Sequence, residues 1–306
     1  MNVHEWALVV FTICAQMSVG AFVVLGVIHW FAARRAGADE ADRLADRALL
    51  AIGPTLVLGM AASLLHLGNP FNGYLAVANL GSSWLSREIV SGVVFAGAGA
   101  VFAFLQWRKQ ASARVRNVVG LVAAAIGLAL VFSMAQVYLL RTVPVWNTVA
   151  TPLMFFVTTF LLGSLAIGAA FVASYRHLQR RNSGNLDTQA ALLRGSLRWI
   201  AIVSIVLLGV EFVVLPMRVA YLAAGPAPAS QSAAMFVGQF GLVLVLRLAL
   251  VFAGAGILGV FVYQNASSTG RERVMGNLTY VAFALVLIGE VLGRFLFYAT
   301  YVRVGI

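Results

Sequence analysis

Eight long apolar stretches divide the sequence, and they constrain the fold more than any other feature. Roughly 20 apolar residues span a hydrocarbon core about 30 Å thick, and each stretch is long enough to cross it. The spans are expected near residues 6–31, 48–66, 88–107, 117–140, 152–175, 197–217, 235–263 and 276–299. We therefore predict an all-α integral membrane protein, a bundle of eight transmembrane helices that forms one domain over residues 1–306.

The composition agrees with a membrane protein and limits the available chemistry. Only 10% of the residues are charged, whereas soluble globular proteins carry about 25%. The single cysteine, Cys14, lies inside the first apolar stretch, so the sequence offers no disulfide and no set of thiolates for a metal or an iron–sulfur cluster. We expect no metal site in this protein, and a metal redox centre must come from a partner.

The basic residues predict the orientation of the bundle. Loops on one side of the membrane hold 15 Lys and Arg residues, and loops on the other side hold 4. The richer side is cytoplasmic under the positive-inside rule, so both termini are expected on the outer, periplasmic side of the cytoplasmic membrane. This asymmetry accounts for the net charge of +11, which therefore indicates a lipid bilayer and not a nucleic-acid partner.

Four ionisable residues lie deep inside the predicted spans, where such residues are costly and usually face a partner or a cavity. They fall in the outer half of the bundle and are Glu211, Arg247, Glu290 and Arg294. Glu290 and Arg294 are spaced i, i+4, which places them on one helix face within ion-pair reach. A structural ion pair that helps to hold the last three spans together is the simpler interpretation. A proton path or the wall of a ligand cavity is the alternative.

Two titratable residues flank the outer loop between the second and third spans. His66 ends the second span, and Glu88 opens the third. Each would stabilise a helix terminus without any further role. A quinol that loses two electrons must also lose two protons, however, and an imidazole beside a carboxylate is suited to accept them. We identify His66 and Glu88 as candidate catalytic residues of a quinol site, with Gln16 and Arg87 as further quinol-binding candidates.

The distribution of the histidines argues against an internal haem. A haem held by two histidines needs both at one depth on facing helices. His4 and His66 are expected at the outer side, and His29 and His177 at the inner side. His4 precedes the first span and His177 belongs to a polar loop, so no suitable pair remains. We expect neither haem nor an iron–sulfur cluster in this protein.

Several short motifs, taken in their order and spacing, are similar to those of one family over most of the sequence. They are His4-Glu5-Trp6 with Phe11-Thr12 and Gln16, Ser63-Leu64-Leu65-His66-Leu67-Gly68-Asn69-Pro70, Leu85-Ser86-Arg87-Glu88-Ile89, Thr142-Val143-Pro144 with Thr151-Pro152, and Gly289-Glu290-Val291-Leu292-Gly293-Arg294 before Phe297-Tyr298. With these motifs the protein resembles the DmsC-type membrane anchors of dimethyl sulfoxide reductases (the DmsC/YnfH family), which are related to the NrfD-like anchors.

The resemblance implies an eight-helix anchor subunit that oxidises menaquinol, with both termini outside. It implies two partners on the periplasmic side, an iron–sulfur electron-transfer subunit and a molybdopterin catalytic subunit. The family's quinol-site histidine matches His66, and its glutamate beyond the next loop matches Glu88. The sequence departs from the family pattern at residues 176–196, expected as a long Arg-rich cytoplasmic loop, and at residues 225–232. The second departure lies on the presumed docking face and leaves the terminal substrate open.

Two other functions stay open at this point. A quinone-coupled anchor of the wider NrfD-like group would serve a different molybdenum or iron–sulfur oxidoreductase. A transporter would need a cavity that opens alternately to both sides of the membrane. The confinement of the polar residues to the outer half argues against a transporter.

Overall fold

A computed structural model describes residues 3–65, 74–181 and 185–304, and over these residues its regular elements are all helices. Eight helical segments are long and apolar enough to cross a membrane, which confirms the predicted fold class. The helices are α1 (Val3–Ala36), α2 (Ala38–Ala45), α3 (Leu49–Leu64), α4 (Leu75–Ala78), α5 (Trp84–Trp107), α6 (Ala113–Val137), α7 (Ala150–Arg181), α8 (Leu186–Ala223), α9 (Ala227–Ala234), α10 (Gly241–Val251), α11 (Gly259–Ala266) and α12 (Glu272–Ala299). Two π-helical segments flank α10, at Met235–Gln239 and Phe252–Leu258.

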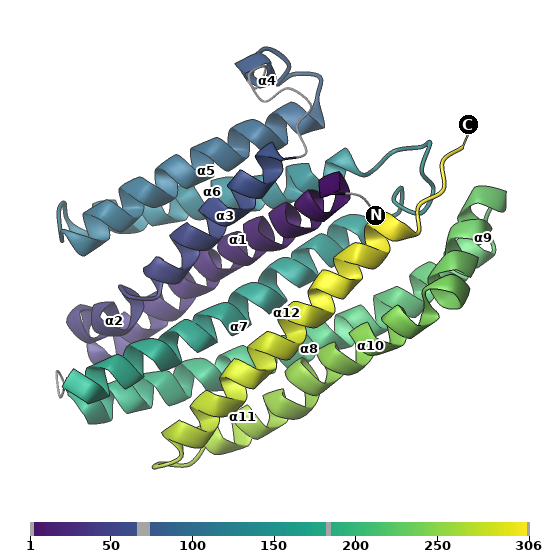
Figure 1. Ribbon diagram of the computed structural model, residues 1–306. Helices are drawn as coiled ribbons and strands as arrows, with labels where there is room; N and C mark the ends of the chain where they lie inside the picture. Colours follow the sequence, from purple (N-terminus) through teal and green to yellow (C-terminus); the bar gives the residue numbers. More distant parts are fainter. Residues whose placement is uncertain (1–2, 66–73, 182–184, 305–306) are drawn as a thin grey trace.

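Helices α1 and α7 form the centre of the bundle (Figure 1). The α5–α6 hairpin lies on one flank, and α8, α10 and α11 lie on the other. The two central helices approach each other most closely at Gly20 and Gly163, where a Cβ on Gly20 would lie 1.8 Å from the carbonyl oxygen of Thr159. Small residues permit such backbone contact between membrane helices. This contact fixes α1 against α7 at mid-bundle.

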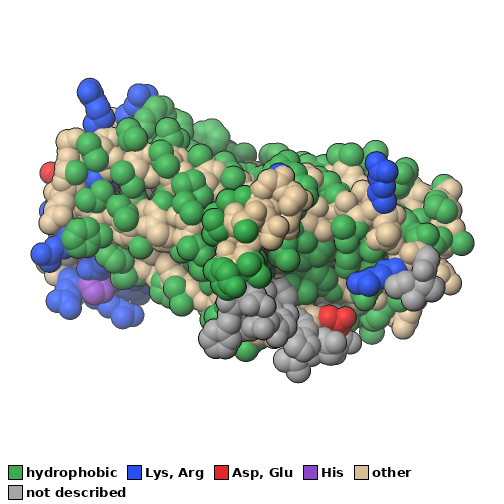
Figure 2. Space-filling view, turned by 90° about the horizontal axis from the view of Figure 1, so that it is seen from above, with side chains coloured by type: hydrophobic (Ala, Val, Ile, Leu, Met, Phe, Trp, Pro, Cys, Tyr) green, Lys and Arg blue, Asp and Glu red, His purple; other side chains and the backbone are tan. Residues whose placement is uncertain are grey.

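The bundle has two distinct ends. Both termini of the protein lie at one end, here called the terminal end, and α2 lies at the opposite end (Figure 1). Figure 2 shows apolar side chains over the middle of one face, with most of that face's Lys and Arg residues gathered at the end that holds α2. We call this the basic end. Its assignment to the cytoplasm remains a prediction from the positive-inside rule.

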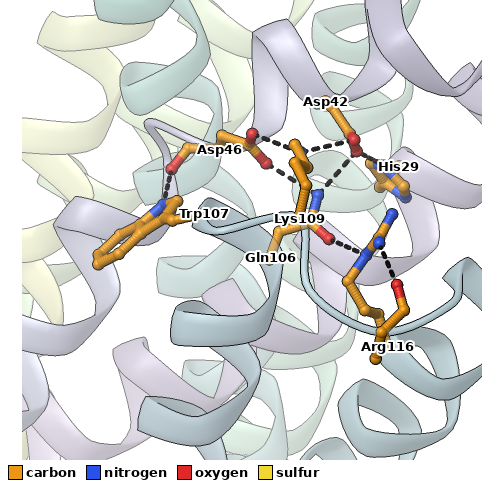
Figure 3. Close-up of polar contacts among 8 residues, drawn as sticks. His29, Asp42, Asp46, Gln106, Trp107, Lys109 and Arg116 are labelled. Atoms are coloured by element: carbon orange, nitrogen blue, oxygen red, sulfur yellow. Dashed lines mark hydrogen bonds and ion pairs between the residues drawn. The ribbon is translucent and has the colours of Figure 1, made fainter.

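A polar cluster ties four helices together at the basic end (Figure 3). Lys109 Nζ donates to Asp42 at 2.6 Å and to Asp46 at 2.7 Å. Gln106 Nε2 also donates to both aspartates, and His29 Nε2 lies 2.7 Å from Asp42 Oδ1. These contacts join α1, α2 and the α5–α6 hairpin. We call these five residues, with Arg116, the basic-end cluster; Arg116 donates to Gln106.

The expectation of a long loop over residues 176–196 is wrong. Helix α7 continues to Arg181, and α8 already begins at Leu186. Asn185 caps α8, since its side chain accepts a hydrogen bond from the backbone N–H of Thr188 at 3.1 Å. Charged residues do not end a helix by themselves. Here they lie on extensions of α7 and α8 beyond the apolar layer.

Candidate functional site

Glu88 lies at the terminal end of α5, one turn inside the helix. Ser83 starts this helix, because its hydroxyl accepts a hydrogen bond from the backbone N–H of Ser86 at 3.3 Å. Glu88 is 7% exposed, so its carboxyl group is turned into the bundle. Among the residues that the structure describes, this carboxyl group has no hydrogen-bond or ion-pair partner. A buried carboxyl group of this kind needs a hydrogen-bond partner, and a bound ligand can supply one.

His66, the other candidate catalytic residue, lies outside the described residues. Helix α3 ends at Leu64, two residues before His66, and it packs against α5, which carries Glu88. Exposed apolar side chains lie at this end of α3, α5 and α6. They are Leu64, Leu65, Trp84, Leu85 and Phe132. The joint role of His66 and Glu88 in a quinol site therefore stays a prediction.

Arg87 faces the loop that precedes α5. Its Nε donates to the carbonyl oxygen of Leu80 at 2.8 Å, and a terminal nitrogen donates to that of Gly81 at 2.9 Å. The guanidinium also lies 4.2 Å from the ring centroid of Trp84. Arg87 thus holds the entry to α5 in place.

Gln16 belongs to a second polar group, at the junction of α1, α7 and α12. It is fully buried and accepts a hydrogen bond from Arg294 at 2.6 Å, while its Nε2 donates to the carbonyl oxygen of Phe155 at 3.2 Å. The Arg294 guanidinium also packs over the Phe155 ring, 4.0 Å from its centroid. Gln16 therefore positions Arg294 between three helices.

A pair of tyrosines lies near both groups. The hydroxyls of Tyr138 and Tyr298 are 2.6 Å apart and buried. Both Glu88 and Arg294 lie close enough to act electrostatically on this pair. Tyr138 was not among the residues predicted from the sequence. A tyrosine at the end of a span normally belongs to the interfacial aromatic belt, so no sequence signal shows that this one turns inward.

The remaining ionisable residues form a triad between α8, α10 and α12. Arg247 lies 2.5 Å from Glu211 and 3.6 Å from Glu290, and Thr158 on α7 donates to Glu290 at 2.5 Å. The three charged side chains are at most 6% exposed. The i, i+4 spacing of Glu290 and Arg294 does not produce an ion pair within the described residues. Each finds a partner on another helix, because packing in the bundle brings those partners closer.

A small cavity lies beside the triad. Its volume is about 40 Å³, and its polar lining includes Arg218, Arg247, Glu290 and Arg294. The Nε atoms of Arg218 and Arg247 have no hydrogen-bond partner among the described residues. One water needs roughly 10–15 Å³ and two to four polar partners. The cavity therefore has the size and the polarity to hold water next to the buried charges.

The site as a whole is an acid–base arrangement in an apolar wall. It combines the buried Glu88 carboxyl group, the tyrosine hydroxyl pair and the buried charges of the triad. The described residues contain no cluster of His, Cys, Asp or Glu that would hold a metal ion. Such a site can accept protons.

Comparison with known proteins gives a consistent result over the full length of the sequence. The family model described as DMSO reductase anchor subunit (DmsC) matches residues 1–300. Two Escherichia coli K12 proteins are named as chains of the anaerobic dimethyl sulfoxide reductase, one of them YnfH. Each is 29% identical to this protein, over 99% of it and 96% of their own length. A Haemophilus influenzae protein, also named as a chain of the anaerobic dimethyl sulfoxide reductase, is 26% identical over 99% of this protein and 97% of its own length.

Proposed function

Because this protein belongs to the family of DMSO reductase anchor subunits, we propose that it oxidises menaquinol at the terminal end of its helix bundle. As a multi-pass membrane anchor it is part of an oxidoreductase complex, which implies catalytic and electron-transfer partners. The observation that carries the proposal is the buried Glu88 carboxyl group, which has no partner among the described residues and lies at the end of the bundle where α3 and α5 expose apolar side chains.

The chemistry assigned to this site is proton acceptance. Each quinol loses two protons and two electrons to become quinone. His66 takes the first hydroxyl proton as a general base, and Glu88 takes the second or relays it to water outside the membrane. The two electrons pass to the nearest cluster of the iron–sulfur subunit and on to the molybdopterin subunit. The apolar side chains around α3 and α5 guide the ring and its tail in from the bilayer.

Gln16 and Arg87 enter this proposal as positioning residues. Arg87 fixes the loop before α5 through two carbonyl oxygens, so it helps to position the start of the helix that carries Glu88. Gln16 holds Arg294, which lies near the tyrosine pair that Glu88 approaches. Neither residue needs to touch the quinol to affect its oxidation.

The proposed orientation follows from the basic residues. The terminal end faces the periplasm and carries the docking surface for both partners, and the membrane is the cytoplasmic one. A reporter that is active only outside the cytoplasm should be active when it is fused after the C-terminus. Activity of a reporter that works only in the cytoplasm would refute the orientation and move the quinol site to the opposite face.

The quinol site is tested with Glu88→Gln and His66→Gln in the assembled complex. Loss of general-base assistance should lower the rate of quinol oxidation by about 10²–10⁴-fold. Reduction by an artificial dye that feeds the catalytic subunit directly should stay at the wild-type rate. Asp39→Asn, an exposed carboxyl group at the basic end, is the matched control. Wild-type quinol oxidation by either variant at normal assembly would refute that residue's role.

A further inference from the structure

A separate pocket lies at the basic end, between α7 and the start of α12. Its volume is about 220 Å³. Three arginines line it, Arg176 from α7 and Arg271 and Arg273 from the turn that opens α12. It lies at the opposite end of the bundle from Glu88 and shares no residue with the proposed quinol site.

The single carboxyl group in the lining, that of Glu272, is already engaged. It forms an ion pair with Arg194 and accepts a hydrogen bond from the backbone N–H of Gly270 at 3.3 Å. The three lining arginines have no carboxylate partner among the described residues. Arg176 donates to the neutral amide oxygen of Asn277 at 2.8 Å, and Arg271 has only a 3.5 Å contact with Asn265. The pocket therefore has an excess of positive charge.

The start of α12 adds further donors to the same pocket. This 28-residue helix begins without a side-chain cap. The backbone N–H groups of Arg273 and Val274, in its first turn, have no backbone partner within the helix because of their position. Together with the helix dipole they favour an anion. The pocket thus combines guanidinium groups with backbone donors, the two kinds of group that bind phosphate oxygens.

An exposed apolar stripe runs away from the pocket along α12. Val274 lines the pocket, and Val281 and Ile288 follow at intervals of seven residues, with exposed fractions of 51%, 49% and 50%. A spacing of seven keeps side chains on nearly the same face of a helix. The acyl tail of a lipid would lie along this stripe if its phosphate occupied the pocket.

From this geometry we propose that the α7–α12 pocket binds a phosphate group, supplied by the headgroup of an anionic phospholipid. Basic pockets between transmembrane helices on the cytoplasmic side are suited to such headgroups. Free phosphate shares the chemistry of the headgroup but would not use the apolar stripe. The proposal does not depend on quinol oxidation, and its test does not use that activity.

The test measures lipid retention by the full-length protein. The purified protein is titrated with phosphatidylglycerol or phosphatidylcholine in mild detergent, and bound lipids are counted by native mass spectrometry. Wild-type protein should retain phosphatidylglycerol in preference to phosphatidylcholine. Arg271→Gln/Arg273→Gln should weaken phosphatidylglycerol binding at least about tenfold. Arg271→Lys/Arg273→Lys keeps the charge and should retain most of the binding.

The matched control is Arg108→Gln/Arg114→Gln, which removes two exposed charges where α5 ends and α6 begins, also at the basic end. It should change phosphatidylglycerol binding by less than about twofold if the pocket, and not overall charge, binds the lipid. An equal loss in the pocket and control variants would overturn the proposal. Displacement of the lipid by inorganic phosphate alone, with Val281→Ser/Ile288→Ser having no effect, would overturn the phospholipid as the source and assign the pocket to free phosphate.

Discussion

Two polar clusters of this bundle pair carboxylates with cationic side chains in different ways. In the basic-end cluster, Asp42 has three nitrogen partners, and Lys109 bridges two carboxylates while its side chain stays 45% exposed. In the triad of Glu211, Arg247 and Glu290, one guanidinium serves two carboxylates, and no side chain is more than 6% exposed. The carboxylates of the first cluster have many partners and lie near the surface; those of the second share one guanidinium and are buried away from bulk solvent.

The comparison separates a structural role from a functional one. Desolvation of buried charges can exceed their mutual attraction, so a buried ion pair is weak support for stability. Ionisable groups inside a membrane protein generally mark a functional path. We infer that the basic-end cluster serves mainly to join helices, whereas the triad is kept for its chemistry. The water-sized cavity beside it and the tyrosine pair towards Glu88 agree with this inference.

Removal of Arg247 should have the largest effect. Arg247→Leu leaves two buried carboxylates without their shared counterion, and such a loss costs about 3–5 kcal/mol. Thermal unfolding of the full-length protein in nanodiscs should show a large destabilisation. Arg247→Lys, which keeps the charge, should be much milder.

The complete neutral replacement, Glu211→Gln/Arg247→Leu/Glu290→Gln, distinguishes the two roles of the triad. Because no uncompensated charge remains, stability should recover towards that of the wild type. If the triad serves the chemistry of the site, quinol oxidation should stay impaired although the protein is stable. A variant that recovers both stability and activity would show that the triad is only structural.

Gly293→Ala should have an intermediate effect by moving Arg247 without removing it. A Cβ at this position would lie 2.3 Å from the Nε of Arg247, so the guanidinium must shift from the position in which it pairs with Glu211 and Glu290. Overpacking of this kind costs about 1–3 kcal/mol. Gly209→Ala on α8 is the control, since nothing lies within 4 Å of its Cβ; thermal unfolding should show little change. Equal behaviour of the two variants would contradict the tight packing around Arg247.

The sequence predicted the spans well because burial in lipid requires long apolar helices, and that requirement is local. It also identified Glu211, Arg247 and Glu290 from their cost in an apolar layer. It did not predict their partners. Glu290 and Arg294 are four residues apart, yet each contacts residues of other helices. Glu290 contacts Thr158 and Arg247, and Arg294 contacts Gln16.

Two features were missed for related reasons. The helical extensions over residues 176–196 carry the charges that normally indicate a loop, and only the capped start of α8 shows otherwise. The inward turn of Tyr138 depends on its contact with Tyr298, 160 residues further along the sequence. Contacts of this length depend on how the helices pack, and helix packing leaves little trace in a single sequence.

The smallest effect is expected in the basic-end cluster. Lys109→Gln removes one charge from a half-exposed group, which is worth about 0.2–1 kcal/mol. Partial burial lowers the pKa of the Lys109 ammonium, but the hydrogen bonds and charges of Asp42 and Asp46 outweigh it and raise the pKa above its usual value. A raised pKa means that this stabilisation is fully present below the pKa of an unfolded lysine, about 10.4, and is lost as pH rises through the folded value. The difference in melting temperature between wild type and Lys109→Gln should therefore be small and constant from about pH 6 to pH 9 and should close only at more alkaline pH. Two outcomes would contradict this prediction for Lys109→Gln. A difference in melting temperature that changed between about pH 6 and pH 9 would assign the pH dependence to another group. A loss of stability as large as that of Arg247→Leu would remove the distinction between the two clusters.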